Sequence, residues 1–398
     1  MESFKLKQAL ILAGGLGERL KPLTLETPKP LISVNGKPFI TYLIDRLISQ
    51  DITDILILTG FKSDQFHFLK NKYSKKIKIR ILITPVAYQT GSRMLSAIKF
   101  IDHHFILLYG DNYWPFNVDA LVNSYKFNNK VGQIVVYRNS DRYSVSNVSM
   151  SEAGLVSEYD KSRKSPNLNY VDIGFGIFSK NVLSILNFSK NDSFEKQVYE
   201  KLVLKEELSG FITNQRYYSL TNLDRLGSLE LMLSQRKYLF LDRDGVINKK
   251  AEKGKYITKW SQWEWNVGAI RFLKLCKKKD IRVIIISNQA AIGRKMASQP
   301  QIDKLHATMK KELDIMKANC IEQIYICPHH WVDNCECRKP KSGLLIRAQK
   351  DLHLDLSKYI FIGDSQSDLL AAQAEGMQAL IIDPKKNIYI QLYKLVSH

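Results

Sequence analysis

The C-terminal part of the chain contains polar residues whose types and order suit phosphoryl transfer. Three groups follow an apolar run: Asp242 and Asp244 in LFLDRDG, Ser287 and Asn288 in IRVIIISN, and Asp364 in FIGDSQSD. Between the last two lie Arg338 and Lys339 in RKP. One carboxylate can attack phosphorus, and a second can protonate the leaving oxygen and later activate water. A third can help to hold Mg²⁺, while a hydroxyl and an amine bind the phosphoryl oxygens. The four motifs together predict a magnesium-dependent phosphoryl-transfer site.

This order of motifs resembles the haloacid-dehalogenase-like phosphatases, whose pattern is DxD, then Ser or Thr, then Lys, then GDxxxD. The resemblance implies that Asp242 is the nucleophile and that Asp244 is the general acid and base. It also implies that Ser287 and Lys339 bind the phosphoryl group. Mg²⁺ would be held by Asp242, the backbone carbonyl of Asp244, and Asp364.

A second signal in this part is the stretch CPHHWVDNCECRKPKSG (327–343), which has the spacing of a metal-binding loop. In a cytosolic chain a cysteine cluster indicates metal more often than a disulfide. Four ligands suited to tetrahedral Zn²⁺ are available: Cys327, Cys335, Cys337 and either His329 or His330. A closed site of this kind is structural, so zinc is predicted to fix the loop that carries the RKP motif.

Two phosphatase groups with such a loop resemble this part of the chain, and the resemblance covers nearly all of 237–398. They are the heptose 1,7-bisphosphate 7-phosphatases and the histidinol-phosphate phosphatases. SNQAAIGR, CPHHW and KSGLL are more similar to the heptose enzymes. The resemblance selects His329 as the zinc ligand and makes Asn288 and Arg338 candidates for substrate binding.

A separate set of candidate residues lies near the N-terminus, in LAGGLGERLKPLTLETPKPL. After the apolar run come three glycines that let backbone N–H groups approach phosphates: Gly14, Gly15 and Gly17. No Gly-Lys-Ser/Thr follows, so a Walker-type phosphate loop is not predicted. The third glycine position of the G-x-G-x-x-G dinucleotide fingerprint is not filled by glycine, so a dinucleotide site is not predicted either. Arg19 and Lys29 add positive charge where a triphosphate could lie. FILLYGD (105–111) ends in Asp111, a suitable Mg²⁺ ligand.

Together these residues resemble the sugar-1-phosphate nucleotidyltransferases over about 7–235, through the pattern AGGxGxRLxPLT…PKP. The resemblance implies that the glycine loop and Arg19 hold the nucleotide phosphates. Lys29 would stabilise the developing charge, and Asp111 would hold Mg²⁺ between the reacting phosphates. It further implies base-binding and sugar-binding candidates: Thr90 and Gly91 in TGS, and Asp172 and Gly174 in VDIGFGIF.

Two departures from that family pattern leave alternatives open. Tyr88 and Gln89 replace a Leu-Gly pair found in many relatives, so the base is not fixed. YYSLTNLDRL (217–226) has no acid where many relatives carry a second metal ligand. Either one metal suffices, or Asp224 substitutes, or the transferase is slow.

The elements that must position these residues alternate between apolar and amphipathic segments. Strands are expected at 8–13, 55–60, 79–83, 104–109, 133–137, 237–241, 281–286, 323–326 and 358–362, and helices at 39–49, 226–236 and 265–278. This alternation predicts an α/β protein with two Rossmann-like domains, each with a mostly parallel sheet. The resemblances imply a glycosyltransferase-A-like domain at 1–235 and a haloacid-dehalogenase-like domain at 237–398, with the zinc loop at 327–337 and a boundary near Arg236.

Composition narrows the class of protein. The chain has 398 residues, a length that suits two domains, and a formal net charge of +20. Its lysines are scattered and no nucleic-acid motif accompanies them, so no nucleic-acid partner is expected. No apolar run approaches the roughly 20 residues that span a bilayer, and 1–15 lacks the features of a secretory signal. We therefore expect a cytoplasmic protein without a membrane partner; the oligomeric state is not predicted.

The two resemblances combine into one functional hypothesis. A heptose 1,7-bisphosphate would lose its 7-phosphate, and the remaining 1-phosphate would be activated with an NTP. The product under this hypothesis is GDP-D-glycero-D-manno-heptose, used for surface polysaccharide such as lipopolysaccharide. The cofactors would be Mg²⁺ in both domains and Zn²⁺ in the phosphatase. Three alternatives remain: a histidinol-phosphate-type phosphatase, a transferase with another base and sugar, and an N-terminal domain that only binds or regulates.

Overall fold

The computed structural model describes residues 6–252 and 254–397, so residues 1–5 of the segment tested for a secretory signal lie outside it. The chain divides into two compact units, Met1–Leu233 and Ser234–His398. Helix α6 (Leu223–Met232) ends the first unit, and strand β14 (Lys237–Leu241) begins the second sheet. The helix predicted at 226–236 thus starts and ends earlier, because the Asn222 side chain accepts a hydrogen bond from the Arg225 N–H and caps it.

The central strands of the first unit are parallel. Strand β1 (Gln8–Ala13) lies between β4 (Asp54–Thr59) and β6 (His104–Tyr109), and β5 (Lys78–Ile83) follows β4 at the edge. The sequence predicts four of these strands to within one residue. Because β1 and β6 are neighbours, the glycine loop after β1 and Asp111 after β6 emerge at the same edge of the sheet.

The rest of this sheet makes it mixed, where the sequence predicts a mostly parallel one. Strand β11 (Tyr170–Ser179) runs antiparallel to both β6 and β8 (Gly132–Arg138), and β12 (Leu208–Thr213) pairs parallel with β8. Strands β9 (Val148–Met150) and β10 (Val156–Tyr159) extend the sheet, and two short pairs lie outside it: β2 (Ser33–Val34) with β3 (Lys37–Pro38), and β7 (Asn112–Tyr113) with β13 (Tyr218–Ser219).

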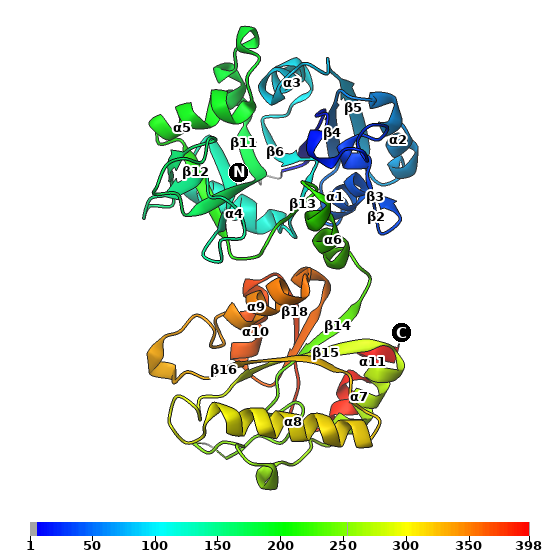
Figure 1. The fold of residues 1–398 in the computed structure, drawn as a ribbon, viewed down its shortest axis with the longest axis vertical. Helices are drawn as coiled ribbons and strands as arrows, with labels where there is room; N and C mark the ends of the chain where they lie inside the picture. The colour runs from blue at the N-terminus through cyan, green and yellow to red at the C-terminus, as the bar shows by residue number, and fades with distance from the viewer. Residues whose placement is uncertain (1–5, 253, 398) are drawn as a thin grey trace, which may run out of the picture. The chain divides into compact units, whose positions relative to one another are not determined.

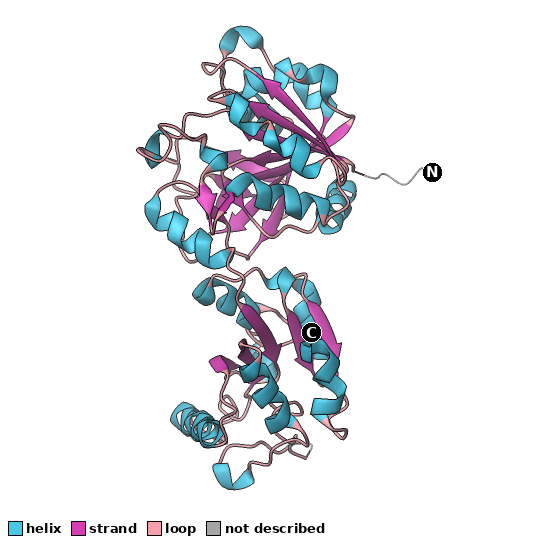
Figure 2. Ribbon diagram, turned by 90° about the vertical axis from the view of Figure 1, so that its right-hand side faces the viewer, coloured by secondary structure: helices cyan, strands magenta, loops and turns pink. Residues whose placement is uncertain are grey.

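Helices cover both faces of this sheet (Figures 1 and 2). Alternate strand residues such as Ile11 and Leu12 point into separate cores. One core contains α1 (Phe39–Ile48), α2 (Phe68–Tyr73), α4 (Val118–Asn128) and α6; the other contains α3 (Thr90–Ser96) and α5 (Glu200–Leu204). Burial on both faces explains why the central strands are continuously apolar.

The second unit has a five-stranded, wholly parallel sheet in the order β16-β15-β14-β17-β18. Its other strands are β15 (Ile281–Asn288), β16 (Ile321–Cys327), β17 (Ile360–Gly363) and β18 (Gln378–Ile381), of which β16 and β18 form the edges. One face packs against α7 (Ala269–Lys278), α8 (Gln299–Ile315) and α11 (Ile388–Ser397), and the other against α9 (Gly343–Leu352) and α10 (Gln366–Ala374) (Figure 1). Both units are therefore α/β domains.

Two local predictions for the second unit need correction. The helix predicted at 265–278 begins only at Ala269, because the preceding Gly268 has a left-handed backbone conformation and caps the helix. Strand β17 begins at Ile360 and not at 358, since a short helical turn at Leu356–Lys358 precedes it. Among the described residues, no helix is both long and apolar enough to cross a membrane.

Candidate active sites

The cavity of the second unit lies at the carboxyl ends of β14, β15 and β17, where ligands bind in parallel α/β sheets. Its volume is about 350 Å³. The structure brings together there every phosphatase residue that the sequence predicts: Asp242, Asp244, Ser287, Asn288, Arg338, Lys339 and Asp364. Lys250, Lys255 and Tyr256, from the loop after β14, also line it and had no predicted role.

Lys339 is the central cation of this cavity. Its Nζ lies 2.8 Å from Asp242 Oδ1 and 2.6 Å from Asp368 Oδ1, and it donates to the Ile286 carbonyl at 2.9 Å. Burial alone would lower the pKa of Lys339, but the charges of Asp242 and Asp368 outweigh it and raise that pKa. The ammonium group therefore stays charged beside the expected nucleophile.

Three carboxylates form a group at this site: Asp242, Asp364 and Asp368, each of which offers one oxygen within 4.8 Å of the others. Burial raises the pKa of Asp242 to about 7; Lys339 opposes this rise and Asp368 adds to it. Hard carboxylate oxygens at this spacing fit a divalent cation such as Mg²⁺. Asp368 was seen in the sequence motif but given no role, and the GDxxxD spacing was the available signal.

Asp244 also lines this cavity but is not one of the three grouped carboxylates. It accepts hydrogen bonds from Arg243 Nη2 at 2.9 Å, Asn248 Nδ2 at 2.8 Å and Gln289 Nε2 at 2.9 Å. Burial would raise the pKa of Asp244, but Arg243 and these hydrogen bonds lower it overall. The side chain of Asp244 is thus held by protein donors, and the contact of its backbone carbonyl with a metal stays a prediction.

Asp364 is packed against the turn after β14. A Cβ on Gly245 would lie 2.1 Å from Asp364 Oδ2, and Gly245 has a φ of +97°. Only glycine fits both the space and the backbone conformation here. Lys250 Nζ also lies 2.8 Å from Asp364 Oδ2, so the loop after β14 reaches directly into the carboxylate group.

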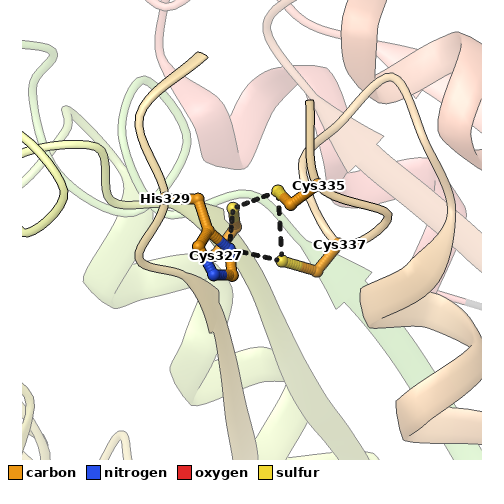
Figure 3. A group of neighbouring side chains, drawn as sticks. All are labelled: Cys327, His329, Cys335 and Cys337. Atoms are coloured by element: carbon orange, nitrogen blue, oxygen red, sulfur yellow. Dashed lines mark hydrogen bonds between the residues drawn. The ribbon is translucent and has the colours of Figure 1, made fainter. Parts of the chain in front are cut away.

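The four predicted zinc ligands cluster (Figure 3). Sγ of Cys327 lies 3.6 Å from Sγ of Cys335, which lies 3.5 Å from Sγ of Cys337; Nδ1 of His329 lies 3.2 Å from the last sulfur. His330 is not part of the cluster, because its Nδ1 accepts the Val332 N–H at 3.2 Å. Three thiols and an imidazole fit the donor set of tetrahedral Zn²⁺.

The cysteine loop is tied to the active site by hydrogen bonds. Asn288 exchanges two of them with the backbone of Lys339: Nδ2 to the carbonyl at 3.2 Å and the Lys339 N–H to Oδ1 at 3.1 Å. Gln289 N–H donates to the Cys327 carbonyl at 2.8 Å. Asn288 thus positions Lys339, a contact that its predicted role in substrate binding does not include.

The cavity of the first unit, about 410 Å³, lies at the carboxyl ends of β1 and β6. It brings together most of the predicted transferase residues: Gly14, Gly15, Gly17, Arg19, Lys29, Thr90 and Asp111. Lys29 Nζ and Asp111 Oδ2 form an ion pair at 2.5 Å. Tyr88 and Gln89 also line this cavity, next to Thr90.

Arg93 holds the glycine loop and was not predicted from the sequence. Its guanidinium is buried and donates to the carbonyls of Gly14, Thr59 and Val86, each at 3.0 Å. A Cβ on Gly14 would lie 2.4 Å from the Arg93 Cζ, so glycine is required for this close approach.

Two predicted residues of the first unit lie elsewhere than expected. Gly91 packs against the segment before α5, where an added Cβ would lie 2.7 Å from the Asp192 carbonyl, and it does not line the cavity. Gly174 sits at a bulge of β11 with a φ of +76° and shapes the strand. Glycine is therefore required at both positions by packing or by backbone conformation, independently of any ligand contact.

Asp172 belongs to a buried polar cluster beside the cavity. It accepts from Gly174 N–H at 2.9 Å and from Tyr159 Oη at 3.3 Å. Burial raises the pKa of Asp172 to about 7, and the charge of Glu195 adds to this rise. Glu195, which the sequence analysis missed, also accepts from Thr90 Oγ1 at 3.4 Å and pairs with Lys161 at 3.5 Å. It therefore connects the predicted base end and sugar end.

The stretch that lacks the second acid lies next to Asp111. Leu220 N–H donates to the Asp111 carbonyl at 2.8 Å, and Ser219 is paired with Asn112. The Ser219 hydroxyl bonds to the Thr221 hydroxyl at 2.7 Å. Asp224 is exposed in the first turn of α6 and does not line the described cavity.

Two family models match this chain. The nucleotidyl transferase model matches residues 8–261, and the polynucleotide kinase 3 phosphatase model matches residues 237–379. The chain is thus an α/β enzyme with a nucleotidyltransferase domain and a phosphatase domain.

Individual proteins are similar to parts of this chain. A D-glycero-beta-D-manno-heptose-1,7-bisphosphate 7-phosphatase of Haemophilus ducreyi is 32% identical over 37% of this chain and 82% of its own length. The alpha-heptose counterpart of Campylobacter jejuni is 38% identical over 37% of this chain and 81% of its own length. A solved structure of HddC from Yersinia pseudotuberculosis is 23% identical and covers 56% of this chain and 98% of its own, with a TM-score of 0.49.

The chain belongs to the nucleotidyl transferase family and, through its second unit, to the family of the heptose-1,7-bisphosphate 7-phosphatases.

Proposed function

We propose that this protein is a bifunctional enzyme of NDP-heptose synthesis. The second unit would remove the 7-phosphate of D-glycero-D-manno-heptose 1,7-bisphosphate, and the first would transfer a nucleotidyl group to the resulting 1-phosphate. The observation that carries the proposal is chemical: a phosphatase related to 7-phosphatases leaves the sugar 1-phosphate that a nucleotidyltransferase requires. One of these relatives is named for the beta anomer and the other for the alpha anomer, so the anomer is left open.

In the phosphatase reaction, an Asp242 oxygen would attack the 7-phosphorus while the bond to the sugar oxygen breaks. Asp244 would take up a proton when the anionic substrate binds and give it to that oxygen. It would then take a proton from water as the water attacks the aspartyl phosphate, which releases phosphate and restores Asp242. Lys339 and Ser287 would hold the phosphoryl oxygens. Asp242, Asp364 and the Asp244 carbonyl would hold Mg²⁺, which screens the carboxylates from the anionic substrate.

One cation of the second cavity supports a substrate with two phosphates. Lys339, Lys250 and Lys255 are each paired with an acidic side chain, whereas Arg338 forms no ion pair among the described residues. One Nη atom of Arg338 is buried and has no hydrogen-bond partner among the described residues. A guanidinium group without a carboxylate partner suits a second phosphate.

In the transferase reaction, a 1-phosphate oxygen would attack the α-phosphorus of an NTP and pyrophosphate would leave. The glycine loop and Arg19 would hold the phosphates, and Lys29 would stabilise the charge that develops. Asp111 would hold Mg²⁺, which would offset the negative charge of the phosphates. Thr90 would lie at the base, and Asp172 at the sugar. We propose GTP as the donor on the family resemblance alone.

We also propose that the cluster of Cys327, His329, Cys335 and Cys337 binds one structural Zn²⁺. Its support is the donor set and the direct hydrogen bonds between this region and the active-site backbone. The fitting role is to hold the RKP segment in place, since no position of a four-ligand site is left for a substrate.

One observation keeps a second candidate function for the first unit. Among the described residues, Asp111 does not form a group of three potential metal ligands, and Ser219 occupies the neighbouring strand. A nucleotide-binding unit that regulates the phosphatase would fit this arrangement. Failure to exchange pyrophosphate with any NTP would favour it.

The proposal is tested by supplying the pure protein with heptose 1,7-bisphosphate, Mg²⁺ and an equimolar mixture of NTPs, and identifying the products by mass. An NDP-heptose is expected, and its mass identifies the base. Heptose 1-phosphate alone would support the phosphatase and contradict the transferase. Untouched bisphosphate would overturn the heptose assignment, and histidinol phosphate would be tested next.

A further inference from the structure

An arginine lies between the two aspartates of the DRDG motif and is almost wholly buried. Arg243 has only 1% of its surface exposed. Its Nη2 donates to both carboxylate oxygens of Asp244 at 2.9 Å and to the Ile257 carbonyl at 3.2 Å. The Trp263 ring lies on its flank, 5.8 Å from ring centre to Cζ. This guanidinium therefore fixes the Asp244 carboxylate from behind.

The other end of the same guanidinium contacts a histidine of helix α8. Arg243 Nη1 lies 3.1 Å from His306 Nε2, and His306 has 7% of its surface exposed. Arginine can only donate hydrogen bonds, so Nε2 must accept and the imidazole proton must lie on Nδ1. Burial and the nearby Arg243 charge lower the pKa of His306 to about 3, so the ring is neutral.

A neutral hydrogen-bond acceptor beside Arg243 does not draw the arginine charge away from Asp244. An aspartate or glutamate there would compete with Asp244 for the charge of Arg243. Among the described residues, Asp244 is the only carboxylate that forms an ion pair with Arg243. The imidazole orients the guanidinium and leaves its charge directed at Asp244.

Helix α8 can hold the imidazole in a fixed place. It is seventeen residues long, and its N-terminus is closed by a capping box between Ser298 and Gln301. Leu305, Met309 and Leu313 on its inner side are buried against the sheet. The element that carries His306 is therefore rigid and is distinct from the loops that form the cavity.

We propose that His306 is a positioning residue for the phosphatase reaction: it holds Arg243 in the orientation that places the Asp244 carboxylate for proton transfer. The proposal rests on the proposed role of Asp244 as the acid that protonates the departing sugar oxygen and as the base that then deprotonates water. It adds a histidine outside the four sequence motifs, more than sixty positions from the carboxylate that it serves.

The test compares His306→Leu, which has no acceptor, with His306→Gln, whose Oε1 can take the place of Nε2. Lys304→Leu, at an exposed position of the same helix, is the matched control. Each full-length variant is assayed with p-nitrophenyl phosphate and with the alkyl phosphate that the wild type turns over, either heptose 1,7-bisphosphate or histidinol phosphate. Pyrophosphate exchange reports on the first unit.

For His306→Leu we expect kcat on the alkyl phosphate to fall roughly 10- to 100-fold with little change in KM, part of the 10²- to 10⁴-fold that a placed acid and base supply. The first-turnover burst of p-nitrophenolate should change less than about threefold, because that leaving group departs without a proton. His306→Gln should recover most of the loss. Equal losses on both substrates, or no recovery with glutamine, would overturn the proposal.

A measurement on the wild type covers the case in which His306→Leu does not fold. Nitrogen-15 NMR of the His306 imidazole should show a neutral ring with the proton on Nδ1 from pH 6 to pH 8. A proton on Nε2, or a charged ring, would overturn the proposal. If the wild type hydrolyses p-nitrophenyl phosphate and histidinol phosphate but not the heptose bisphosphate, the proposed substrate fails and the inference about His306 is still tested.

Discussion

At the scale of single residues, the two cavities share one device: a lysine paired with an aspartate. Lys339 contacts Asp242 at 2.8 Å, and Lys29 contacts Asp111 at 2.5 Å. In each pair the lysine is the more buried partner, and both groups would face a phosphate. A substitution in either pair should therefore affect the activity of its own unit and leave that of the other unit unchanged.

Replacing Asp242 by asparagine should abolish phosphate release from the bisphosphate, by at least roughly a thousandfold, because an amide cannot form the aspartyl phosphate. Pyrophosphate exchange by the first unit should be unaffected. Asp303→Asn, at an exposed position of α8, is the control. Loss of both activities in Asp242→Asn would show that the units are not independent.

The converse change is Lys29→Met. We expect pyrophosphate exchange to fall roughly 100-fold, since the variant lacks the cation that would meet the developing charge. Phosphate release should remain at the wild-type rate, and Lys37→Met, at an exposed position of β3, should alter neither activity. Unchanged exchange in Lys29→Met would remove this lysine from the transferase mechanism.

Asp172 supplies a prediction about pH. Its folded pKa of about 7 lies above its ordinary value of 3.8, because of burial. Between these values the folded chain keeps a proton that the unfolded chain has lost, so stability falls as the pH rises from about 4 to about 7 and is flat above that range. Asp172→Asn should remove this dependence and stabilise β11 at pH 8.

Hydrogen exchange of peptides from 171–178, corrected for intrinsic exchange rates, measures this effect in the full chain. Glu152→Gln, in an exposed turn, provides a comparison. Equal pH slopes in the wild type and in Asp172→Asn would refute the prediction.

Residues that the sequence analysis identified stand beside strands in recognisable order, whereas the missed ones depend on distant partners. Arg93 contacts the carbonyl of Gly14, 79 positions away, and Glu195 contacts the Thr90 hydroxyl, 105 positions away. His306 lies on an ordinary amphipathic helix face, with no local pattern to distinguish it. Such contacts follow from tertiary packing, which a motif search does not contain.

At the scale of elements, strands buried on both faces were predicted well, and strands at the margins were not. The ends of β1 and β6 agree with the prediction to the residue. Strand β18 was missed because it is short and largely exposed. The antiparallel direction of β11 depends on the connections around it, which no periodicity encodes.

The cysteine loop is the element with the clearest experimental handle. Metal analysis should find about one zinc per chain, and Cys335→Ser should lose most of it. Phosphate release should fall as well, because the Lys339 segment loses its anchor, while pyrophosphate exchange persists. Cys320→Ala, outside the cluster, should keep its zinc. Full zinc content in Cys335→Ser would contradict the assignment of the ligands.

At the scale of the whole molecule, each cavity is complete within its own unit. The lining of the first cavity ends at Asp111, and that of the second begins at Asp242. We therefore expect Asp242→Asn and Lys29→Met proteins, each of which makes little or no NDP-heptose from the bisphosphate, to make it much faster when mixed. Product mass and rate measure this, with each variant alone as the control. A mixture no faster than the variants alone would mean that the intermediate is not released from the chain.

Only Ser234, Gln235 and Arg236 separate the last residue of the first unit from strand β14. Because both units lie on one chain, they are translated together and are present in equal numbers wherever the gene is expressed. Expression level then cannot adjust one unit against the other. Under the proposed function, any imbalance between the supply of the sugar 1-phosphate and its consumption must be corrected by the turnover numbers of the two sites.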